Sequence, residues 1–231
     1  MSQIKQELKQ KTLEMTYLFY DMGLSTSLDS GDISLRDPET DFIYIDPRPS
    51  KNFRISPNWR CITVDDIVVM DMDGHVIDGG KSGDRMPTVE APMHLAIYKS
   101  RPDAYGIVHS HALYSGVFAA CGMDIPAALV ETQLNAKGDI LCAEYGKVSS
   151  QILADNIAKA LGKEQKAALL RQHGAVYIGK DIEDAFTVAE YVEKGAQTTL
   201  LAWSAGMKLL PPLRDLQDIL DETIWDIRDE I

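Results

Sequence analysis

Cysteine and basic residues are scarce in this chain of 231 residues. The three cysteines, Cys61, Cys121 and Cys142, are widely spaced and form no CxxC pair, which favours a reducing cytoplasm over a disulfide-stabilised secreted protein. Lys and Arg number 23 against 35 Asp and Glu, giving a net charge of −12. A phosphate backbone or an anionic membrane is repelled by such a chain, so neither nucleic acid nor a membrane is expected as a partner.

Long apolar runs and flexible linkers are also lacking. No stretch reaches the roughly 18 apolar residues of a membrane span, and the N-terminal segment mixes Lys, Glu and Gln with apolar residues, unlike a signal peptide. There is no Pro/Gly/Ser linker, internal repeat or low-complexity block. With 45% hydrophobic residues the chain can bury a sizeable core, and we interpret residues 1–231 as a single α/β domain with an antiparallel or mixed sheet.

Hydrophobic periodicity predicts the order of the elements. An apolar face from Ile4 to Phe19 predicts an opening helix that stops near Gly23. Residues 31–80 contain short β-rich runs, among them GDISLRD, FIYIDP, CITVDD and IVVMDMDG, separated by turn residues. Further helices are predicted at 90–100, 111–120, 148–161, 182–205 and from 213 onward, and strands at 105–109, 168–172 and 175–178.

Three of the five histidines stand at strand ends. His109 and His111 lie in YGIVHSH, where residues i and i+2 of a strand project to the same side. His173 follows the apolar run AALLRQ and precedes Gly174. Three imidazoles from two strand ends form the ligand set of an open catalytic zinc-type site, although two satisfied or exposed histidines remain the alternative for the HxH pair.

Glu90 stands at the predicted start of a helix, where the helix dipole favours a carboxylate. A simple first-turn acidic residue is the alternative to a catalytic role. His94, one turn later, is expected to pack or hydrogen-bond within the fold rather than bind a metal, and His75 is expected at the surface.

A set of motifs in one order carries a resemblance. Glu90-x3-His94, RPD at 101–103, VHSH, IPA at 125–127 and QHGAVYIGKDIEDAF at 172–186 together resemble the class II aldolase/adducin family, in particular its fuculose-phosphate aldolase and ribulose-phosphate epimerase branch. The resemblance implies a central, largely antiparallel sheet flanked by helices, and a tetramer with active sites between subunits. It implies that His109, His111 and His173 bind one divalent metal, most simply Zn²⁺ with Mn²⁺ or Co²⁺ as alternatives, and that Glu90 is the catalytic acid/base.

The chain departs from this family where the aldolases bind phosphate. The family's small neutral donors are replaced by Gly31-Asp32, by Arg48 with a following proline, and by Thr88-Val89. Asp32 would repel a phosphate dianion, and a valine side chain cannot donate a hydrogen bond. Arg48 offers a bidentate grip for a carboxylate or a differently placed phosphate, with a solvated loop arginine as the alternative. We therefore expect Gly31, Asp32, Arg48 and Thr88 to contact a substrate that differs from the family's.

The proton donor is a second departure. The tyrosines that serve the aldolases have no counterpart after the IPA motif or in the tail beyond Leu213, where Trp225 is the aromatic residue. The sequence nevertheless predicts a metal-dependent lyase that cleaves a sugar-like hydroxyketone by aldol chemistry. A decarboxylase of a keto or hydroxy acid is the main alternative, followed by a 4-epimerase and by a non-catalytic adducin-like module, against which the retained histidines and Glu90 argue.

Overall fold

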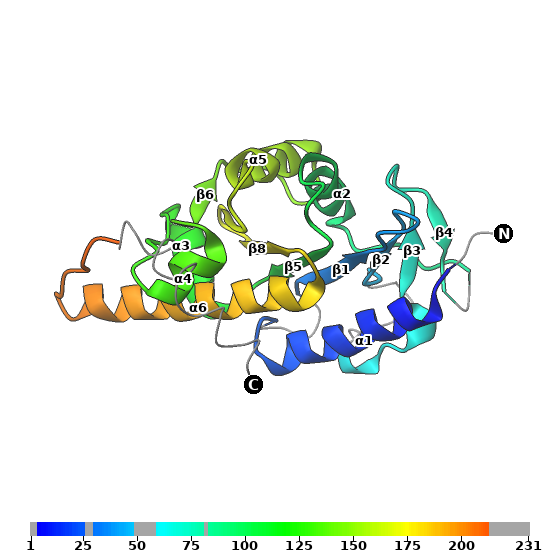
Figure 1. Cartoon of the computed structure of the whole chain (residues 1–231), viewed down its shortest axis with the longest axis horizontal. Coiled ribbons are helices and arrows are strands. Elements are labelled where there is room, and N and C mark those ends of the chain that lie inside the picture. The colour runs from blue at the N-terminus through cyan, green and yellow to red at the C-terminus, as the bar shows by residue number, and fades with distance from the viewer. Residues whose placement is uncertain (1–3, 26–29, 49–58, 81–82, 213–231) are drawn as a thin grey trace, which may run out of the picture.

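In the computed structural model, residues 4–25, 30–48, 59–80 and 83–212 are described, so the helix predicted from residue 213 onward lies outside the described part. The fold is α/β, with one sheet between two helical layers (Figure 1). The helices are α1 (Gln6–Asp21), α2 (Ala91–Ser100), α3 (Leu113–Cys121), α4 (Val130–Ala136), α5 (Gln151–Leu161) and α6 (Ile182–Ser204). The strands are β1 (Asp32–Arg36), β2 (Ile43–Ile45), β3 (Val68–Met70), β4 (Val76–Asp78), β5 (Gly106–Ser110), β6 (Leu141–Ala143), β7 (Ala167–Leu170) and β8 (Gly174–Gly179).

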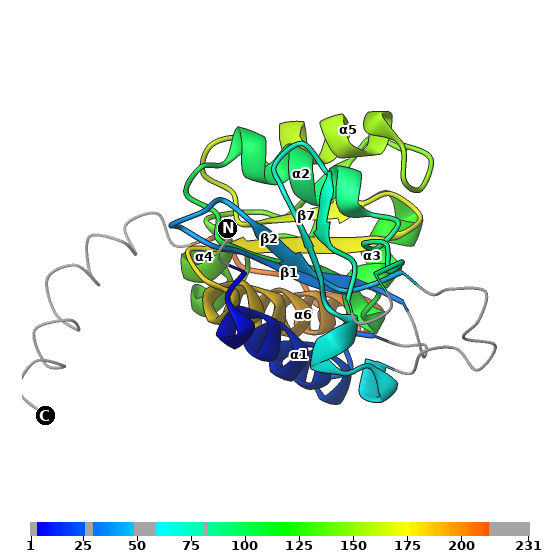
Figure 2. The ribbon, with the colours of Figure 1, turned by 90° about the vertical axis from the view of Figure 1, so that its right-hand side faces the viewer.

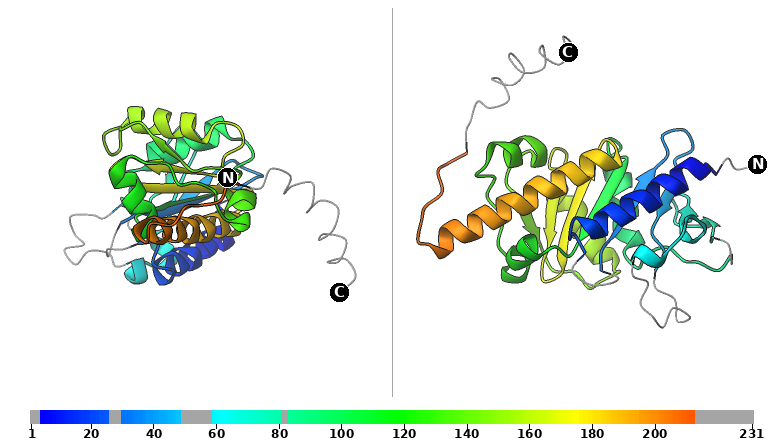
Figure 3. Two further views of the ribbon diagram at one scale, coloured as in Figure 1. Left: turned by 90° about the vertical axis from the view of Figure 1, so that its left-hand side faces the viewer. Right: turned by 90° about the horizontal axis from the view of Figure 1, so that it is seen from below.

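The sheet has eight strands in the order β4-β3-β2-β1-β5-β8-β7-β6. Every neighbouring pair is antiparallel except β6 and β7, which run parallel at one edge. Helices α2 and α5 cover one face, and α1 and α6 cover the other (Figures 2 and 3). The predicted, largely antiparallel sheet flanked by helices is confirmed.

Alternating side chains divide the core between the two faces. On β5, Val108 packs beneath α6, whereas Ile107 packs beneath α2 and α5, and β8 repeats the alternation with Tyr177 and Ile178. Since strand residues two apart share a face, His109 extends the row begun by Ile107 and lies on the α2 side. The strand β5, which fills the core, thus also places His109 on the side of the sheet that is covered by α2, the helix that Glu90 precedes.

Two parts of the predicted element order need correction. The run CITVDD does not form a strand; it lies across two 3₁₀ turns, Trp59–Cys61 and Val64–Asp66, and Asp66 caps the second turn by accepting hydrogen bonds from the Thr63 amide and hydroxyl. The short elements α4 and β6 have no counterpart in the predicted order. Among the described residues, no helix has both the length and the apolar character of a membrane span.

Candidate active site

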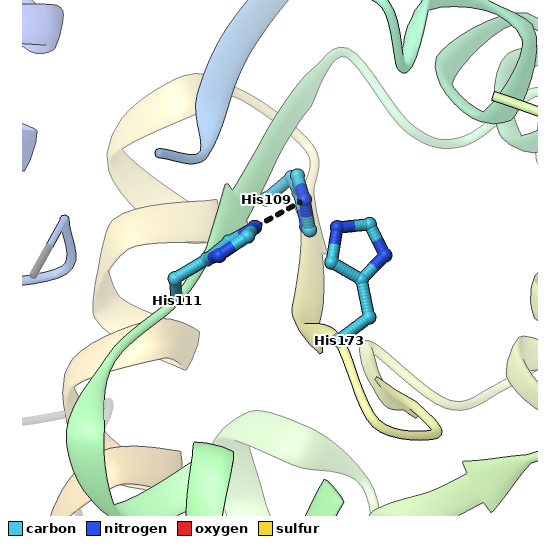
Figure 4. A group of neighbouring side chains, drawn as sticks. All are labelled: His109, His111 and His173. Atoms are coloured by element: carbon cyan, nitrogen blue, oxygen red, sulfur yellow. Dashed lines mark hydrogen bonds between the residues drawn. The ribbon is translucent and has the colours of Figure 1, made fainter. Parts of the chain in front are cut away.

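Two neighbouring strands bring three histidines together. His109 is near the end of β5, His111 follows that strand, and His173 occupies the turn that joins β7 to β8 (Figure 4). The three ring centroids are 4.9 Å from one another in every pair. Because β5 and β8 pair antiparallel with Ser110 opposite Ala175, the end of β5 lies beside the start of β8. This pairing makes one cluster from residues far apart in the sequence.

Close packing explains why glycines flank this cluster. A Cβ added at Gly174 would lie 2.3 Å from the carbonyl oxygen of Ser110. At Gly31, which has a φ of +76°, it would lie 2.5 Å from the carbonyl oxygen of His109. Gly31, predicted from the resemblance as a substrate-binding residue, is buried, and because it has no side chain the backbone before β1 can lie against the His109 carbonyl of β5.

A backbone hydrogen bond fixes which ring nitrogen of His109 carries the proton. Its Nδ1 lies 3.0 Å from the backbone oxygen of Ala175 and must donate to it, because a carbonyl only accepts. The Nε2 therefore carries a lone pair. Metal-binding histidines commonly donate their other ring N–H to a carbonyl or carboxylate, which fixes the tautomer and the ring orientation.

The charge state of the cluster also suits a metal. Burial lowers the pKa of His109 to about 4, and burial followed by the neighbouring His111 lowers the pKa of His173 to about 4. Both rings are therefore neutral at pH 7, the form in which imidazole binds metal. One ring atom from each of the three histidines lies within 4.8 Å of the others, and the buried Nδ1 of His173 has no hydrogen-bond partner among the described residues. These donors fit a divalent cation.

Glu90 is the residue immediately before α2 and is buried. Its Oε1 accepts a hydrogen bond from the Ser149 backbone N–H at 3.2 Å, while its Oε2 is buried without a partner among the described residues. Burial, and next the charge of Asp32, raise the pKa of Glu90 to about 7. The carboxyl group is thus poised to exchange a proton near neutral pH.

Asp32 interacts electrostatically with Glu90 and with two of the histidines. Its cross-strand partner on β5 is His109, and its charge acts on Glu90, His109 and His173. The Asp32 Oδ1 accepts from Nε2 of His94 at 2.8 Å, and Oδ2 accepts from the Thr88 hydroxyl at 2.6 Å. Burial opposes ionisation, but the hydrogen bonds from His94 and Thr88 outweigh it and lower the pKa of Asp32 to about 2. Asp32 is therefore a fixed negative charge at the site.

The remaining sequence candidates fall into two groups. His94 is fully buried, with Nδ1 2.7 Å from the Ser34 hydroxyl, so the prediction that it is a hydrogen-bonding residue of the fold is confirmed. His75 is exposed, as predicted. Arg48 is exposed, and its backbone N–H donates to the Met86 carbonyl, so a substrate contact of its guanidinium stays a prediction.

One contributor to the site was missed in the sequence analysis. Ser149 acts through its backbone, and its left-handed conformation, with a φ of +64°, leaves no trace in the residue type. The available signal was the Ser149-Ser150 pair before an apolar helix, which is typical of a helix N-cap and predicts the turn but not its contact with Glu90.

Comparison with known proteins places the chain in a family. The family described as Class II Aldolase and Adducin N-terminal domain matches residues 10–200. The chain is 30% identical over 189 residues to a 5-deoxy-D-ribulose 1-phosphate aldolase of Bacillus thuringiensis serovar kurstaki, covering 82% of this chain and 83% of that one. It is 29% identical over 225 residues to an L-ribulose-5-phosphate 4-epimerase, UlaF, of Salmonella paratyphi C, covering 93% and 92%. An L-fuculose 1-phosphate aldolase structure superposes with a TM-score of 0.84 at 28% identity, covering 95% and 97%.

The chain therefore belongs to the class II aldolase and adducin family. It is an aldolase-type lyase that cleaves a carbon–carbon bond in a sugar-like hydroxyketone, as the sequence predicted. The three-histidine cluster agrees with the metal dependence of this class of aldolases.

Proposed function

We propose that His109, His111 and His173 bind one divalent metal ion and that Glu90 is the general acid/base of the aldol reaction. The observation that supports this most strongly is the buried Oε2 of Glu90, which has no hydrogen-bond partner among the described residues; Glu90 precedes the helix that covers the same face of the sheet as His109. We propose zinc as the resident ion, since a set of nitrogen ligands suits it, with Mn²⁺ or Co²⁺ as alternatives. When bound, such an ion supplies Lewis-acid polarisation of substrate oxygens.

The residues of the chain then account for the proton transfers. In the cleavage direction, a hydroxyl proton leaves the substrate, the carbon–carbon bond breaks to give an aldehyde, and the carbon left on the ketone fragment takes up a proton. A group with a pKa of about 7 can accept or deliver a proton at neutral pH, which is the range where general acid/base catalysis is most effective. Bound metal would lower the pKa of Glu90, whereas closure of the site over substrate would raise it.

Asp32 defines the part of the substrate that we propose lies beside it. Its carboxylate is held by His94 and Thr88, so a phosphate dianion placed there would face the fixed negative charge of Asp32. A neutral hydroxyl donates to a carboxylate instead. We propose that the substrate end beside Asp32 is an unphosphorylated hydroxyl-bearing end, with Gly31 and Thr88 shaping the pocket around it.

The oligomeric state, the cellular location and the domain organisation of the protein are also proposals. A homotetramer is supported by exposed apolar side chains near and beyond the end of α6, namely Leu201, Trp203, Met207 and Leu210. A cytoplasmic location is supported by Cys61, Cys121 and Cys142, which are all free thiols. A single domain is supported by the family match over residues 10–200. A substrate-binding role for Arg48 rests on the sequence alone, and so does the decarboxylase alternative that depends on it.

The experiment that tests the proposed function combines metal analysis with substrate screening. Purified protein is expected to contain about one zinc per chain and to cleave members of a panel of free and phosphorylated ketoses, with loss of activity in chelator and recovery on adding Zn²⁺. Release of CO₂ from a panel of keto acids, without aldehyde formation from any ketose, would contradict the aldolase assignment and favour the decarboxylase.

A further inference from the structure

Ser149 adopts a backbone conformation that serine rarely takes. Its φ is +64°, in the left-handed region that glycine populates freely and other residues enter at a cost. The side chain is exposed, so core packing does not explain the conformation. Backbone strain of this kind persists where the surrounding structure imposes it, and such residues cluster at functional sites.

The conformation aims the Ser149 amide at Glu90. The backbone N–H donates to Oε1 of Glu90 at 3.2 Å, between residues 59 apart in the sequence. Among the described residues, the Ser149 amide is the hydrogen-bond donor to the Glu90 side chain, and Oε2 is buried without a partner. The two oxygens of one carboxyl group are thereby made different, one held by the amide and the other available.

The turn that carries Ser149 is fixed on both sides. The Ser150 amide donates to the Lys147 carbonyl at 3.0 Å, and the Ser150 hydroxyl caps α5 by accepting from the Leu153 amide at 3.2 Å. Gly146 packs so closely that an added Cβ would lie 2.4 Å from the Leu153 Cα. Because α5 also packs against α2, the helix that Glu90 precedes, the amide and the carboxylate are held by one packed pair of helices.

We propose that Ser149 is a positioning residue for the aldol reaction: its backbone amide holds Oε1 of Glu90, so that Oε2 is the oxygen that exchanges the proton with substrate. The inference rests on the proposed role of Glu90. A hydrogen bond to an ionised carboxylate also stabilises the charged form, so this amide opposes the rise in pKa that burial causes.

The test compares three substitutions at Ser149 in the full-length, metal-loaded protein. Ser149→Gly keeps the N–H and removes the conformational strain, so its kcat should stay within about twofold of the wild type. Ser149→Pro removes the N–H and fixes φ near −65°, so kcat should fall by about 10- to 100-fold, the usual effect of losing a hydrogen bond to a charged group. KM and metal content should change little, and the pH profile should shift toward higher pH.

Ser149→Val provides a second route if the proline variant does not fold. It retains the N–H, but a β-branched residue strongly disfavours positive φ, so the amide should turn away from Glu90 and kcat should again fall. Wild-type kcat and pH profile in a folded, metal-loaded proline or valine variant would overturn the proposal. So would a glycine variant as slow as the valine one, because the serine side chain would then be responsible.

A double-mutant cycle separates this inference from the proposed function. If Ser149 acts through Glu90, then the folded variant that slows the wild type, Ser149→Pro or Ser149→Val, should cause little further loss in a Glu90→Gln background. A full additional loss there would overturn the positioning role while leaving Glu90 as the acid/base. Wild-type turnover of Glu90→Gln alone would instead overturn the proposed function.

Discussion

The Nε2 atoms of His109 and His111 face each other at 3.2 Å. Two nitrogens bound to one tetrahedral zinc at about 2.0–2.1 Å lie about 3.3 Å apart by simple geometry, so the spacing in the protein is already close to that of a bound pair. Little rearrangement is needed for the two rings to share an ion, and this preorganisation favours tight binding.

The proposed metal ligands are tested by removing them. Replacing His109 with Ala, alone or together with His111→Ala, should abolish turnover and lower metal affinity by more than the ~10–100-fold that loss of an outer hydrogen-bond partner costs. Inductively coupled plasma analysis gives the metal content, and circular dichroism checks the fold. His75→Ala, at an exposed turn, is the matched control and should keep both metal and activity. Full metal occupancy in the double variant would disprove the site.

Glu90→Gln should separate proton transfer from metal binding. Glutamine keeps the shape of the side chain but cannot exchange a proton, so turnover should fall by ~10²–10⁴ while the metal content is unchanged. The limb of the kcat profile near pH 7 that reports Glu90 should disappear. Glu183→Gln, an exposed residue paired with Lys11, is the control and should behave as wild type. Unchanged turnover would reduce Glu90 to a residue of the helix start.

Substrate charge is tested at Asp32. Asp32→Asn combined with Val89→Ser removes the fixed charge and adds a donor, so inorganic phosphate and L-fuculose 1-phosphate should bind about tenfold more tightly or better. Turnover of unphosphorylated ketoses should decline in the same variant, because a hydroxyl loses its charged acceptor. Asp73→Asn, at an exposed aspartate, is the control. Efficient cleavage of L-fuculose 1-phosphate by the unaltered protein would show that our interpretation of the pocket is wrong.

Asp46 provides a prediction about stability. It is fully buried, it accepts hydrogen bonds from the Thr16 hydroxyl and the Ile33 amide, and burial raises its pKa to about 8 from 3.8. The unfolded chain therefore releases this proton near pH 4 and the folded chain near pH 8, so stability is lost as pH rises between these values. Asp46→Asn should raise the free energy of unfolding by about 1–3 kcal/mol at pH 8 and by less at pH 5.5.

Urea titrations of the metal-loaded protein at the two pH values measure this difference. Asp155→Asn, at an exposed residue on α5, is the control and should change the free energy of unfolding little at either pH. An equal gain for Asp46→Asn at pH 5.5 and at pH 8 would mean that the carboxyl group does not titrate as the buried environment requires.

The core strands and long helices could be predicted from the sequence because their hydrophobic periodicity is regular along most of each element. In β5 and β8 successive residues pack on opposite faces, and the buried residues of α6 recur at helical spacing from Ile182 to Thr199. The segment containing α4 and β6 could not be predicted in the same way. Its seven-residue helix is held by tertiary contacts, such as the Thr132 hydroxyl bonded to the Tyr191 carbonyl and packed against Gly195, which no local pattern encodes.

In the site too, local spacing predicts some features, whereas contacts between residues far apart in the sequence are not predicted. His109 and His111 could be recognised because their spacing alone puts them on one side of a strand. The hydrogen bond between His94 and Asp32 joins residues 62 apart in the sequence, and no local sequence pattern predicts it. A run such as CITVDD was misassigned because β-branched residues favour a strand, while the Thr63-x-x-Asp66 spacing also favours a capped turn.

The antiparallel pairing of β5 with β8 has a consequence for how the protein is made. His109 and the Ala175 carbonyl that orients it are 66 residues apart in the chain, and His173 reaches the cluster only when these two strands have met. Closing so long a loop has an entropic cost, so we expect the three histidines to come together only once β5 and β8 have paired. If the three histidines bind an ion as proposed, a chain that holds this ion has already assembled the centre of its sheet, and metal capture is expected to follow the pairing of these strands.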